Sequence, residues 1–255
     1  MYHNIFDSHA HYDDEQFEKD RNELLVSFKE KGISGVVCCG VNIPTSEFAV
    51  ELSHKYYFMY SAVGFHPLDN DEYRDGDLER IKELAQDEKC VAIGEIGLDY
   101  HYEKESRENQ LIILEKQIQL ANKLDLPIIF HDRESHEDTL HILKKYKPKG
   151  VLHCFSGSVE MAKEVIKLGM YIGLGGAVTF KNAVKPCEVA KFVPEDRLLI
   201  ETDAPYMTPV PFRGKRCDSL HIPYTAERIA ELRGCTAQEI LDLTDKNARQ
   251  LFNIR

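Results

Sequence analysis

Residues 107–133 read RENQLIILEKQIQLANKLDLPIIFHDR. From about residue 107 to residue 124, apolar side chains recur at the spacing of an amphipathic helix. The apolar side chains on one side of this stretch are Leu111, Leu114, Ile118 and Leu124. The short apolar run that begins near Pro127 has the length and composition of a buried strand, and His131 follows it directly. The segment therefore predicts a helix, then a strand with a polar side chain at its carboxyl end.

The same alternation of short apolar runs and amphipathic stretches extends along the whole chain. Further helices are predicted from about Asp14 to Lys31, ending at Gly32, and from Ser158 to Leu168, ending at Gly169, because glycine suits the left-handed position after a helix. Residues 225–252 predict two or three more helices. The candidate strands begin near Ile5, Gly35, Tyr57, Val91, Pro127, Gly150, Tyr171 and Leu198.

Eight strands, each followed by a helix or by a loop long enough to hold one, predict a parallel sheet with right-handed crossovers. Eight such units close into a (β/α)8 TIM barrel, and a length of 255 residues is typical of that fold. We therefore expect residues 1–255 to form a single TIM-barrel domain, with the C-terminal helices completing the outer ring. The periodicity alone is equally compatible with an open, doubly wound sheet.

The composition restricts the class of protein. A net charge of −11 argues against a general nucleic-acid coat protein, because binding to a duplex needs a basic surface, but it allows local binding of a few phosphates. The longest apolar runs, such as Tyr56 to Tyr60, are too short to span a membrane, and no signal-peptide pattern opens the sequence. We expect a cytoplasmic protein with no membrane contact and predict no protein partner. Seven cysteines without a CxxC pair suggest small core residues rather than disulfides or a thiolate zinc site.

Side chains able to bind metals occur where the predicted strands end. Asp7, His9 and His11 are spaced by two on the first strand, so all three are expected to face one space. In a parallel barrel the carboxyl ends of all strands open on the same rim, where active sites are built. The other residues of this kind at strand ends are Glu95, His131, His153 and Asp203.

Four imidazoles and two carboxylates can hold two divalent ions about 3.5–4 Å apart, with one carboxylate between them. Glu95 is the candidate bridge, and we expect the glycines at 94 and 97 to leave room for the ions or to suit a tight turn. Divalent ions lower the pKa of a water molecule enough to make it a nucleophile near neutral pH. Asp203 is the candidate general base, so Asp203 and Glu95 are the expected catalytic residues. Magnesium, manganese and zinc all suit this set of ligands.

Several other residues are candidates for contacts with substrate. His66 follows the third strand, and a basic cluster lies in the loop after Asp203. In an acidic chain such a cluster favours contact with phosphate, and salt bridges to nearby acids are the alternative. The aromatic residues on neighbouring loops are candidates for stacking on the bases of a single strand, and packing at the rim is the alternative. They are Tyr100, Tyr102, Phe155 and Phe180. The cationic candidates are Arg133, Lys181, Arg213, Lys215 and Arg216.

Together these motifs resemble the TatD family, within the metal-dependent hydrolase (amidohydrolase) superfamily, over essentially the whole chain. The matching segments are DSHAH (7–11), GFHP (64–67), GEIGLDY (94–100), PIIFHDR (127–133), HCFSG (153–157), ETDAPY (201–206) and TPVPFRGKR (208–216). The resemblance implies a TIM barrel with a divalent-metal-dependent 3′-to-5′ exonuclease activity on single-stranded DNA, and in some members on RNA. It also implies that His9 and His11 form the paired histidines, Glu95 the bridge, His131 and His153 the later histidines, and Asp203 the aspartate.

One segment departs from the family pattern. The family usually continues RGKR with Asn-Glu-Pro, whereas Cys217, Asp218 and Ser219 follow here. We expect this difference to affect which substrate the protein prefers more than it affects metal binding. The leading hypothesis is a phosphodiesterase that acts on DNA ends. The alternatives are an amide or ester hydrolase, such as a deacylase for a charged tRNA or a small molecule, and a non-catalytic protein that binds metal or nucleic acid.

Overall fold

A computed structural model describes residues 2–102 and 106–255 of the chain. Within these ranges the sheet has eight strands, ordered β1 to β8, and each strand is parallel to the next. The strands are β1 (Ile5–Ala10), β2 (Ile33–Cys39), β3 (Met59–Val63), β4 (Cys90–Asp99), β5 (Ile128–Arg133), β6 (Gly150–Leu152), β7 (Tyr171–Leu174) and β8 (Leu198–Ile200). Each begins within two residues of its predicted start, so the sequence pattern located the sheet correctly.

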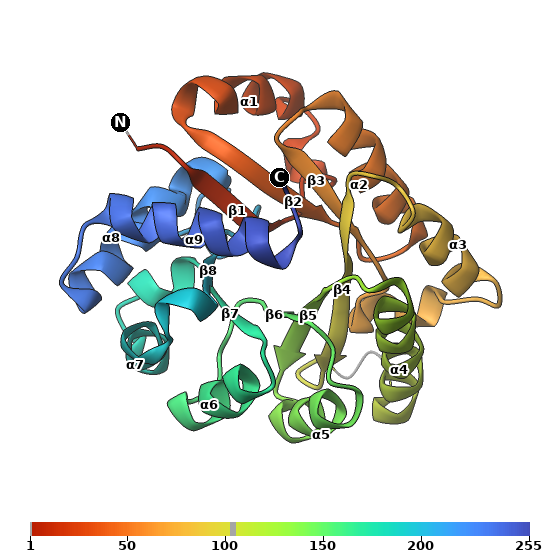
Figure 1. Ribbon diagram of the computed structural model, residues 1–255. Coiled ribbons are helices and arrows are strands. Elements are labelled where there is room, and N and C mark those ends of the chain that lie inside the picture. Colours follow the sequence, from red (N-terminus) through yellow and green to blue (C-terminus); the bar gives the residue numbers. More distant parts are fainter. Residues whose placement is uncertain (1, 103–105) are drawn as a thin grey trace.

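Helices alternate with the strands and surround them (Figure 1). The α-helices are α1 (Arg21–Phe28), α2 (Ile43–Lys55), α3 (Asp77–Leu84), α4 (Arg107–Leu124), α5 (His136–Tyr146), α6 (Val159–Lys167), α7 (Val184–Phe192), α8 (Ile222–Arg233) and α9 (Ala237–Leu251). The short 3-10 helices are η1 (Glu15–Phe17), η2 (Lys29–Lys31), η3 (Pro67–Glu72), η4 (Gly176–Thr179), η5 (Glu195–Arg197) and η6 (Ser219–His221).

The barrel closes where the chain beyond β8 meets β1. Ala10 and Ala204 form a parallel bridge. The backbone N–H of His11 donates to the carbonyl of Ala204 at 2.7 Å, and the N–H of Asp203 donates to the carbonyl of His9 at 3.0 Å. These bonds confirm the predicted (β/α)8 barrel and exclude the open sheet, which would leave β1 and β8 apart.

Alternate residues of the strands form two apolar layers. One layer lies between strands and helices and includes Val36, Cys38 and Ile128. The other layer includes Val37 and Ile129, the next residues along the same strands, and it fills the barrel interior. Because both faces of nearly every strand are buried, the strands appear in the sequence as continuous apolar runs.

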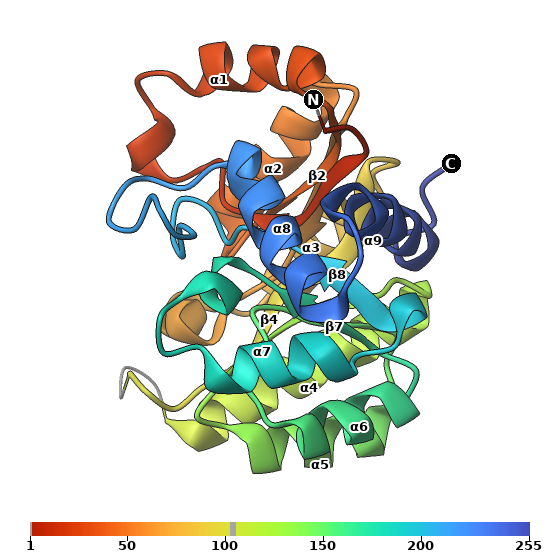
Figure 2. The same ribbon diagram turned by 90° about the vertical axis from the view of Figure 1, so that its left-hand side faces the viewer.

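The two C-terminal helices take different positions. Helix α8 packs beside α7 in the outer ring, whereas α9 packs beside α8 and more extensively than α8 against β1 and β8 (Figures 1 and 2). Ala248 of α9 and the following Phe252 belong to the interior layer, and the ring of Phe252 stacks on that of Phe6 with centroids 6.3 Å apart. The chain end therefore helps to close the amino end of the barrel and leaves the carboxyl end for a site.

Two helix predictions differ in outcome. Helix α4 begins and ends as its periodicity predicts, with Ser106 accepting a hydrogen bond from the N–H of Asn109 as its N-cap. The single helix expected over residues 14–31 is instead η1, α1 and η2, which end at Gly32 with φ 85°. The guanidinium of Arg21 donates to the carbonyls of Asp13 and Asp14 and holds that loop outside any helix.

None of the helices that the structure describes is both long and apolar enough to cross a membrane.

Candidate metal centre

The carboxyl ends of the strands bring the predicted polar side chains together. His9 lies in β1, His11 follows it, Glu95 lies in β4, His131 lies in β5, and His153 and Asp203 follow β6 and β8. Three groups of these side chains, joined by His66, have ligand atoms within 4.8 Å of one another. The groups are His9, Glu95 and His153; His9, His11 and Asp203; and His66, Glu95 and His131. Residues that are up to about 190 positions apart in the chain thus form groups able to bind metal ions.

Glu95 stands between two sets of histidines. Its Oε2 atom lies 3.3 Å from Nε2 of His9 and 3.2 Å from Nε2 of His11. Its Oε1 atom lies 3.0 Å from Nδ1 of His131 and 2.8 Å from Nε2 of His153. The side chain is only 4% exposed. One buried carboxylate therefore offers a separate oxygen to each set.

His66 and Asp203 complete the centre from opposite sides. Nε2 of His66 lies 3.5 Å from Oε1 of Glu95. Oδ1 of Asp203 lies 3.6 Å from Nε2 of His9 and 3.7 Å from Nε2 of His11. Asp203 has φ 60°, in the left-handed region that residues other than glycine rarely adopt and that often occurs at functional sites. Its side chain is 19% exposed, so it can reach both the centre and solvent.

Each of four imidazoles also has a polar atom behind it, on the ring nitrogen that faces away from Glu95. Two of these atoms belong to Cys39, whose carbonyl lies 3.0 Å from Nδ1 of His11 and whose Sγ lies 3.4 Å from Nδ1 of His9. The others are Oδ2 of Asp99, 3.1 Å from Nε2 of His131, and Oε1 of Glu201, 3.5 Å from Nδ1 of His153. Such acceptors select the imidazole nitrogen that remains available to a metal.

Two residues of the site, Cys39 and Glu201, are not predicted from the sequence. The composition of the chain places Cys39 with the core cysteines, although it stands at the end of an apolar strand, which is also where the other site residues stand. Glu201 directly follows β8, two residues before Asp203, and could have been noted by that position. The sequence does not indicate which side chain each of these residues contacts in the folded protein.

Electrostatics in the centre favour positive charge beside its carboxylates. Burial works to raise the pKa of Glu95, but the histidines, His153 first, hold it well below its usual value. Burial works to lower the pKa of His11, yet Glu95 and Asp203 raise it to about 9. Burial prevails at His66 and lowers its pKa to about 3. Protons on some imidazoles compensate the acidic groups, and a metal ion can do the same.

Asp7 does not face the same space as His9 and His11, although its spacing predicted that it would. Its carboxylate accepts hydrogen bonds from the hydroxyls of Thr202 and Ser219, both at 2.6 Å, and from the backbone N–H of His9 at 3.3 Å. The register of β1 against β2 shifts between Asp7 and Ala10, so strict alternation does not hold across this segment. Asp7 ties β1 to the chain after β8 and does not orient an imidazole ring.

The glycines near Glu95 have a packing function. A Cβ atom at Gly97, where φ is 155°, would lie 2.0 Å from the carbonyl oxygen of His131. A Cβ at Gly94 would lie 2.7 Å from the side chain of Ile129. Both glycines therefore allow β4 to approach β5 closely, which differs from the expected role of making room for ions.

A hollow of about 590 Å³ opens from the centre to the surface. The predicted residues that line it are His11, His66, Glu95, Tyr102, His131, Arg133, His153 and Asp203. It is also lined by Asp13, Asp14, Asp69, Tyr206, Met207, Val41 and Leu68. His9 is fully buried behind this wall. Arg133 lies with its guanidinium 5.0 Å from the ring centroid of Tyr102, so cationic and aromatic groups meet at the mouth.

The other predicted cations do not line the hollow. Arg216 donates to both carboxylate oxygens of Asp20, at 2.6 and 2.7 Å, as the salt-bridge alternative anticipated. The guanidinium of Arg213 lies 3.9 Å from the ring centroid of Phe180, and Lys215 lies above Phe212. Lys181 is exposed in the segment between η4 and α7. These side chains lie on loops at the carboxyl side of β7 and β8.

The three residues that depart from the family pattern anchor their loop. The hydroxyl of Ser219 donates to Asp7, and its backbone N–H donates to the hydroxyl of Tyr12 at 2.9 Å. Asp218 accepts from the N–H of Leu220 at the start of η6, and Cys217 is fully buried. These residues hold the loop against β1 and are not among the residues that line the hollow.

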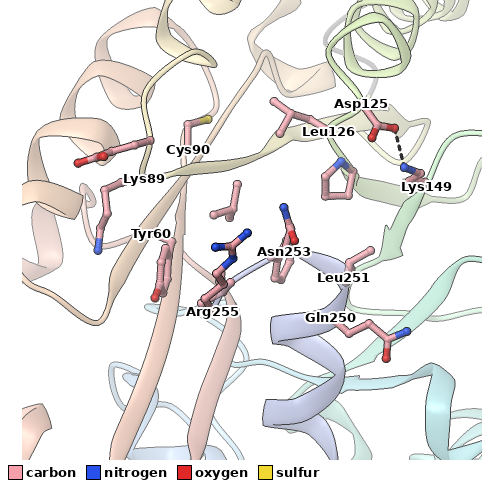
Figure 3. A pocket seen from close by; sticks show the side chains of 15 residues that line it. Tyr60, Lys89, Cys90, Asp125, Leu126, Lys149, Gln250, Leu251, Asn253 and Arg255 are labelled. Carbon is pink, nitrogen blue, oxygen red and sulfur yellow. Dashed lines mark hydrogen bonds and ion pairs between the residues drawn. The ribbon is translucent and has the colours of Figure 1, made fainter.

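Figure 3 shows a second hollow, of about 800 Å³, at the opposite end of the barrel. It lies where β4 begins at Cys90 and is bordered by the last residues of the chain. Its lysines already have partners, since Lys149 lies 2.5 Å from Asp125 and Lys89 donates to the carbonyl of Tyr57 at 2.9 Å. No metal-ligand group of the described residues occurs there, although this hollow is larger than the one at the centre.

A family model described as TatD related DNase matches residues 6–253. The chain belongs to the TatD family. The match includes β1 from its second residue, the whole of β2 to β8 and every residue of the centre, so the resemblance inferred from short motifs extends through the fold. As a TatD family member, the chain is a metal-dependent hydrolase.

Named relatives agree with this assignment over their full lengths. The chain is 46% identical over 253 residues to the uncharacterized metal-dependent hydrolase YabD of Bacillus subtilis, covering 98% of this chain and 99% of the relative. It is 34% identical over 259 residues to the 3′-5′ ssDNA/RNA exonuclease TatD of Escherichia coli K12, covering 98% and 99%. The crystal structure of the TatD homolog YJJV of Escherichia coli K12 superposes with a TM-score of 0.93 at 31% identity, covering 100% of both chains.

Proposed function

We propose that this TatD family hydrolase is a 3′-to-5′ exonuclease that acts on single-stranded DNA, and also on RNA, with two divalent metal ions. The observation that supports it best is the position of Glu95, with one oxygen toward His9 and His11 and the other toward His131 and His153. The relative named as a 3′-5′ ssDNA/RNA exonuclease supports the choice of substrate. We expect the enzyme to act in the cytoplasm.

The donor set fits divalent cations. Imidazole nitrogens and carboxylate oxygens suit manganese and zinc, and the oxygens also suit magnesium. His9, His11 and Asp203 would hold one ion, and His131 and His153 the other, with Glu95 between them. The polar atoms behind the rings support this assignment, because they leave one nitrogen of each ring free toward the centre. Bound ions would supply an activated water and stabilise negative charge on the phosphate.

The chain's own contribution is to position groups and to move a proton. Asp203 has one carboxylate oxygen toward His9 and His11 and remains partly exposed, so it can accept a proton from an attacking water and pass it to solvent. Glu95 is held by its five histidine neighbours and keeps the two halves of the centre at a fixed separation. His66 borders the hollow beside Glu95 and is available to contact the substrate.

The hollow favours a flexible strand end. Glu95 is 3% exposed, so a scissile phosphate has to enter the hollow to reach it, which one strand can do more easily than an intact duplex. Among the described residues Arg133 has no hydrogen-bonded or carboxylate partner at the mouth, so its guanidinium is available to a phosphate. Tyr102 and Tyr206 are about half exposed beside it and offer stacking surfaces to bases. Lys181, Arg213 and Lys215 would guide the rest of the strand from neighbouring loops, whereas the predicted contact of Arg216 is replaced by its pair with Asp20.

The test is cleavage of end-labelled oligonucleotides. Metal-free protein is reconstituted with magnesium, manganese or zinc and mixed with a single-stranded oligonucleotide labelled at its 3′ or its 5′ end. We expect stepwise, metal-dependent shortening from the 3′ end and loss of activity in Asp203→Asn. Folded, metal-loaded protein that cleaves neither oligonucleotide would overturn the proposed function.

A further inference from the structure

Glu201 is a buried acidic residue without an evident task in the proposed function. It follows β8 directly and is 0% exposed. Its Oε1 atom accepts a hydrogen bond from the backbone N–H of Cys154, which lies just after β6. In the sheet β6 is the neighbour of β7, and β7 is the neighbour of β8 (Figure 1). A buried carboxylate is costly unless it is paired, so its place requires a reason.

The only basic side chain of the described residues within ion-pair distance of Glu201 is His153. Its Nδ1 atom lies 3.5 Å from Oε1 of Glu201. Within the part of the chain that the structure describes, Nδ1 of His153 and Oε2 of Glu201 are both buried without a hydrogen-bond partner. A ring N–H and a carboxylate are natural partners, so the Glu201 carboxylate, whose Oε1 is the nearer oxygen, is the available acceptor for Nδ1 of His153.

The surrounding backbone accommodates the carboxylate. A Cβ atom at Gly173 in β7 would lie 2.6 Å from Oε2 of Glu201, so only glycine leaves the space that Glu201 occupies. Cys154, which donates to Oε1, has φ 42°, in the left-handed region. Glu201 thus binds the backbone immediately after His153 as well as facing its ring.

We propose that Glu201 is a positioning residue that fixes the orientation and tautomer of His153. With a proton held on Nδ1 toward Glu201, the lone pair of Nε2 points to the centre, where it lies 2.8 Å from Glu95. A carboxylate behind an imidazole also makes the ring a stronger ligand. This inference rests on the proposed metal centre, and its test measures metal binding and the tautomer, so it can fail or succeed independently of nuclease activity.

The first measurement uses metal affinity. Metal-free wild type, Glu201→Gln and Glu201→Asp are titrated with zinc against a chelating indicator. We expect Glu201→Gln to bind zinc about 10–100-fold more weakly than wild type and Glu201→Asp to recover part of the loss. The matched control is Glu134→Gln, because Glu134 also faces Nδ1 of a histidine, the exposed His101 at 2.7 Å, but lies outside the centre. Equal affinities for all the folded variants would overturn the proposal.

The second measurement needs no variant. In zinc-loaded wild type labelled with nitrogen-15 at histidine, we expect His153 to carry its proton on Nδ1. A proton on Nε2 of His153 would overturn the proposal even if Glu201→Gln does not fold. Gly173→Ala adds a further arm, because its Cβ would lie 2.6 Å from Oε2 of Glu201 and 3.1 Å from Cα of His153, so it disturbs their contact without removing the carboxylate. We expect zinc affinity to fall in this variant too, and an unchanged affinity in folded Gly173→Ala would contradict the assigned role.

Discussion

Nε2 of His131 lies 3.1 Å from Oδ2 of Asp99, on the nitrogen that faces away from the centre. The other oxygen of Asp99 accepts hydrogen bonds from the backbone N–H groups of His101 and Tyr102. Asp99 therefore organises the loop after β4 and also supports the ring of His131.

Replacing Asp99 by asparagine is predicted to weaken metal binding about 10–100-fold, because an amide is a poorer acceptor for the N–H of an imidazole that holds a metal. The amide oxygen can still accept the loop hydrogen bonds, so the fold should persist. Titration of metal-free Asp99→Asn with zinc or manganese against an indicator measures the change, with circular dichroism as the check on folding. Wild-type affinity in the folded variant would show that Asp99 serves the loop alone.

Arg133→Ala is predicted to raise the KM for a single-stranded oligonucleotide about tenfold and to change kcat much less. Its guanidinium borders the hollow without a carboxylate partner among the described residues, so it is available to a phosphate in the ground state and the transition state alike. Arg216→Ala is the control, since that guanidinium is bound by Asp20, and we expect it to lower stability by about 1 kcal/mol with a smaller effect on KM. A larger rise in KM for Arg216→Ala than for Arg133→Ala would contradict this ranking.

Gly97→Ala is predicted to reduce the free energy of unfolding by about 3 kcal/mol or more, because the added methyl group would lie 2.0 Å from the carbonyl oxygen of His131. Gly169→Ala is a matched control: Gly169 also has positive φ, at 87°, but no atom lies within 4 Å of its added Cβ. We expect Gly169→Ala to lower the free energy of unfolding by only about 1 kcal/mol. Denaturant unfolding of both variants distinguishes steric overlap from backbone strain, and equal losses would show that the close approach of β4 to β5 matters little.

His221 is predicted to make stability depend on pH. A hydrogen bond to Asp218 raises the pKa of His221 above its usual value, despite the opposing effect of burial. The pair of His221 and Asp218 adds to the free energy of unfolding. This stabilisation is fully present below about pH 6.5, the pKa of a histidine in the unfolded chain, and is lost as the pH rises through the raised pKa of His221 in the folded protein. The stability difference between wild type and His221→Gln should therefore shrink by about 1 kcal/mol or less from pH 5.5 to about pH 9. A difference that grows over this range would reverse the assigned sign.

Much of the fold could be predicted from local pattern. The period of apolar residues separates strands from helices over a few residues, as residues 107–133 illustrate, and both faces of the strands are buried as their apolar runs indicate. Closure of the barrel could not be decided in this way, because the bonds from His11 to Ala204 and from Asp203 to His9 join the two ends of the chain.

The sequence by itself determined which residue types stand at the carboxyl ends of the strands, and parallel topology then places them on one rim. Only the tertiary structure decided which oxygen of Glu95 faces which histidine, that Cys39 and Glu201 stand behind the rings, and that Arg216 is bound to Asp20. The physical reason is that residue type and spacing are local properties, whereas pairing depends on contacts between distant segments. The shift of register in β1 adds to this, because it ends the simple alternation that placed Asp7 with His9.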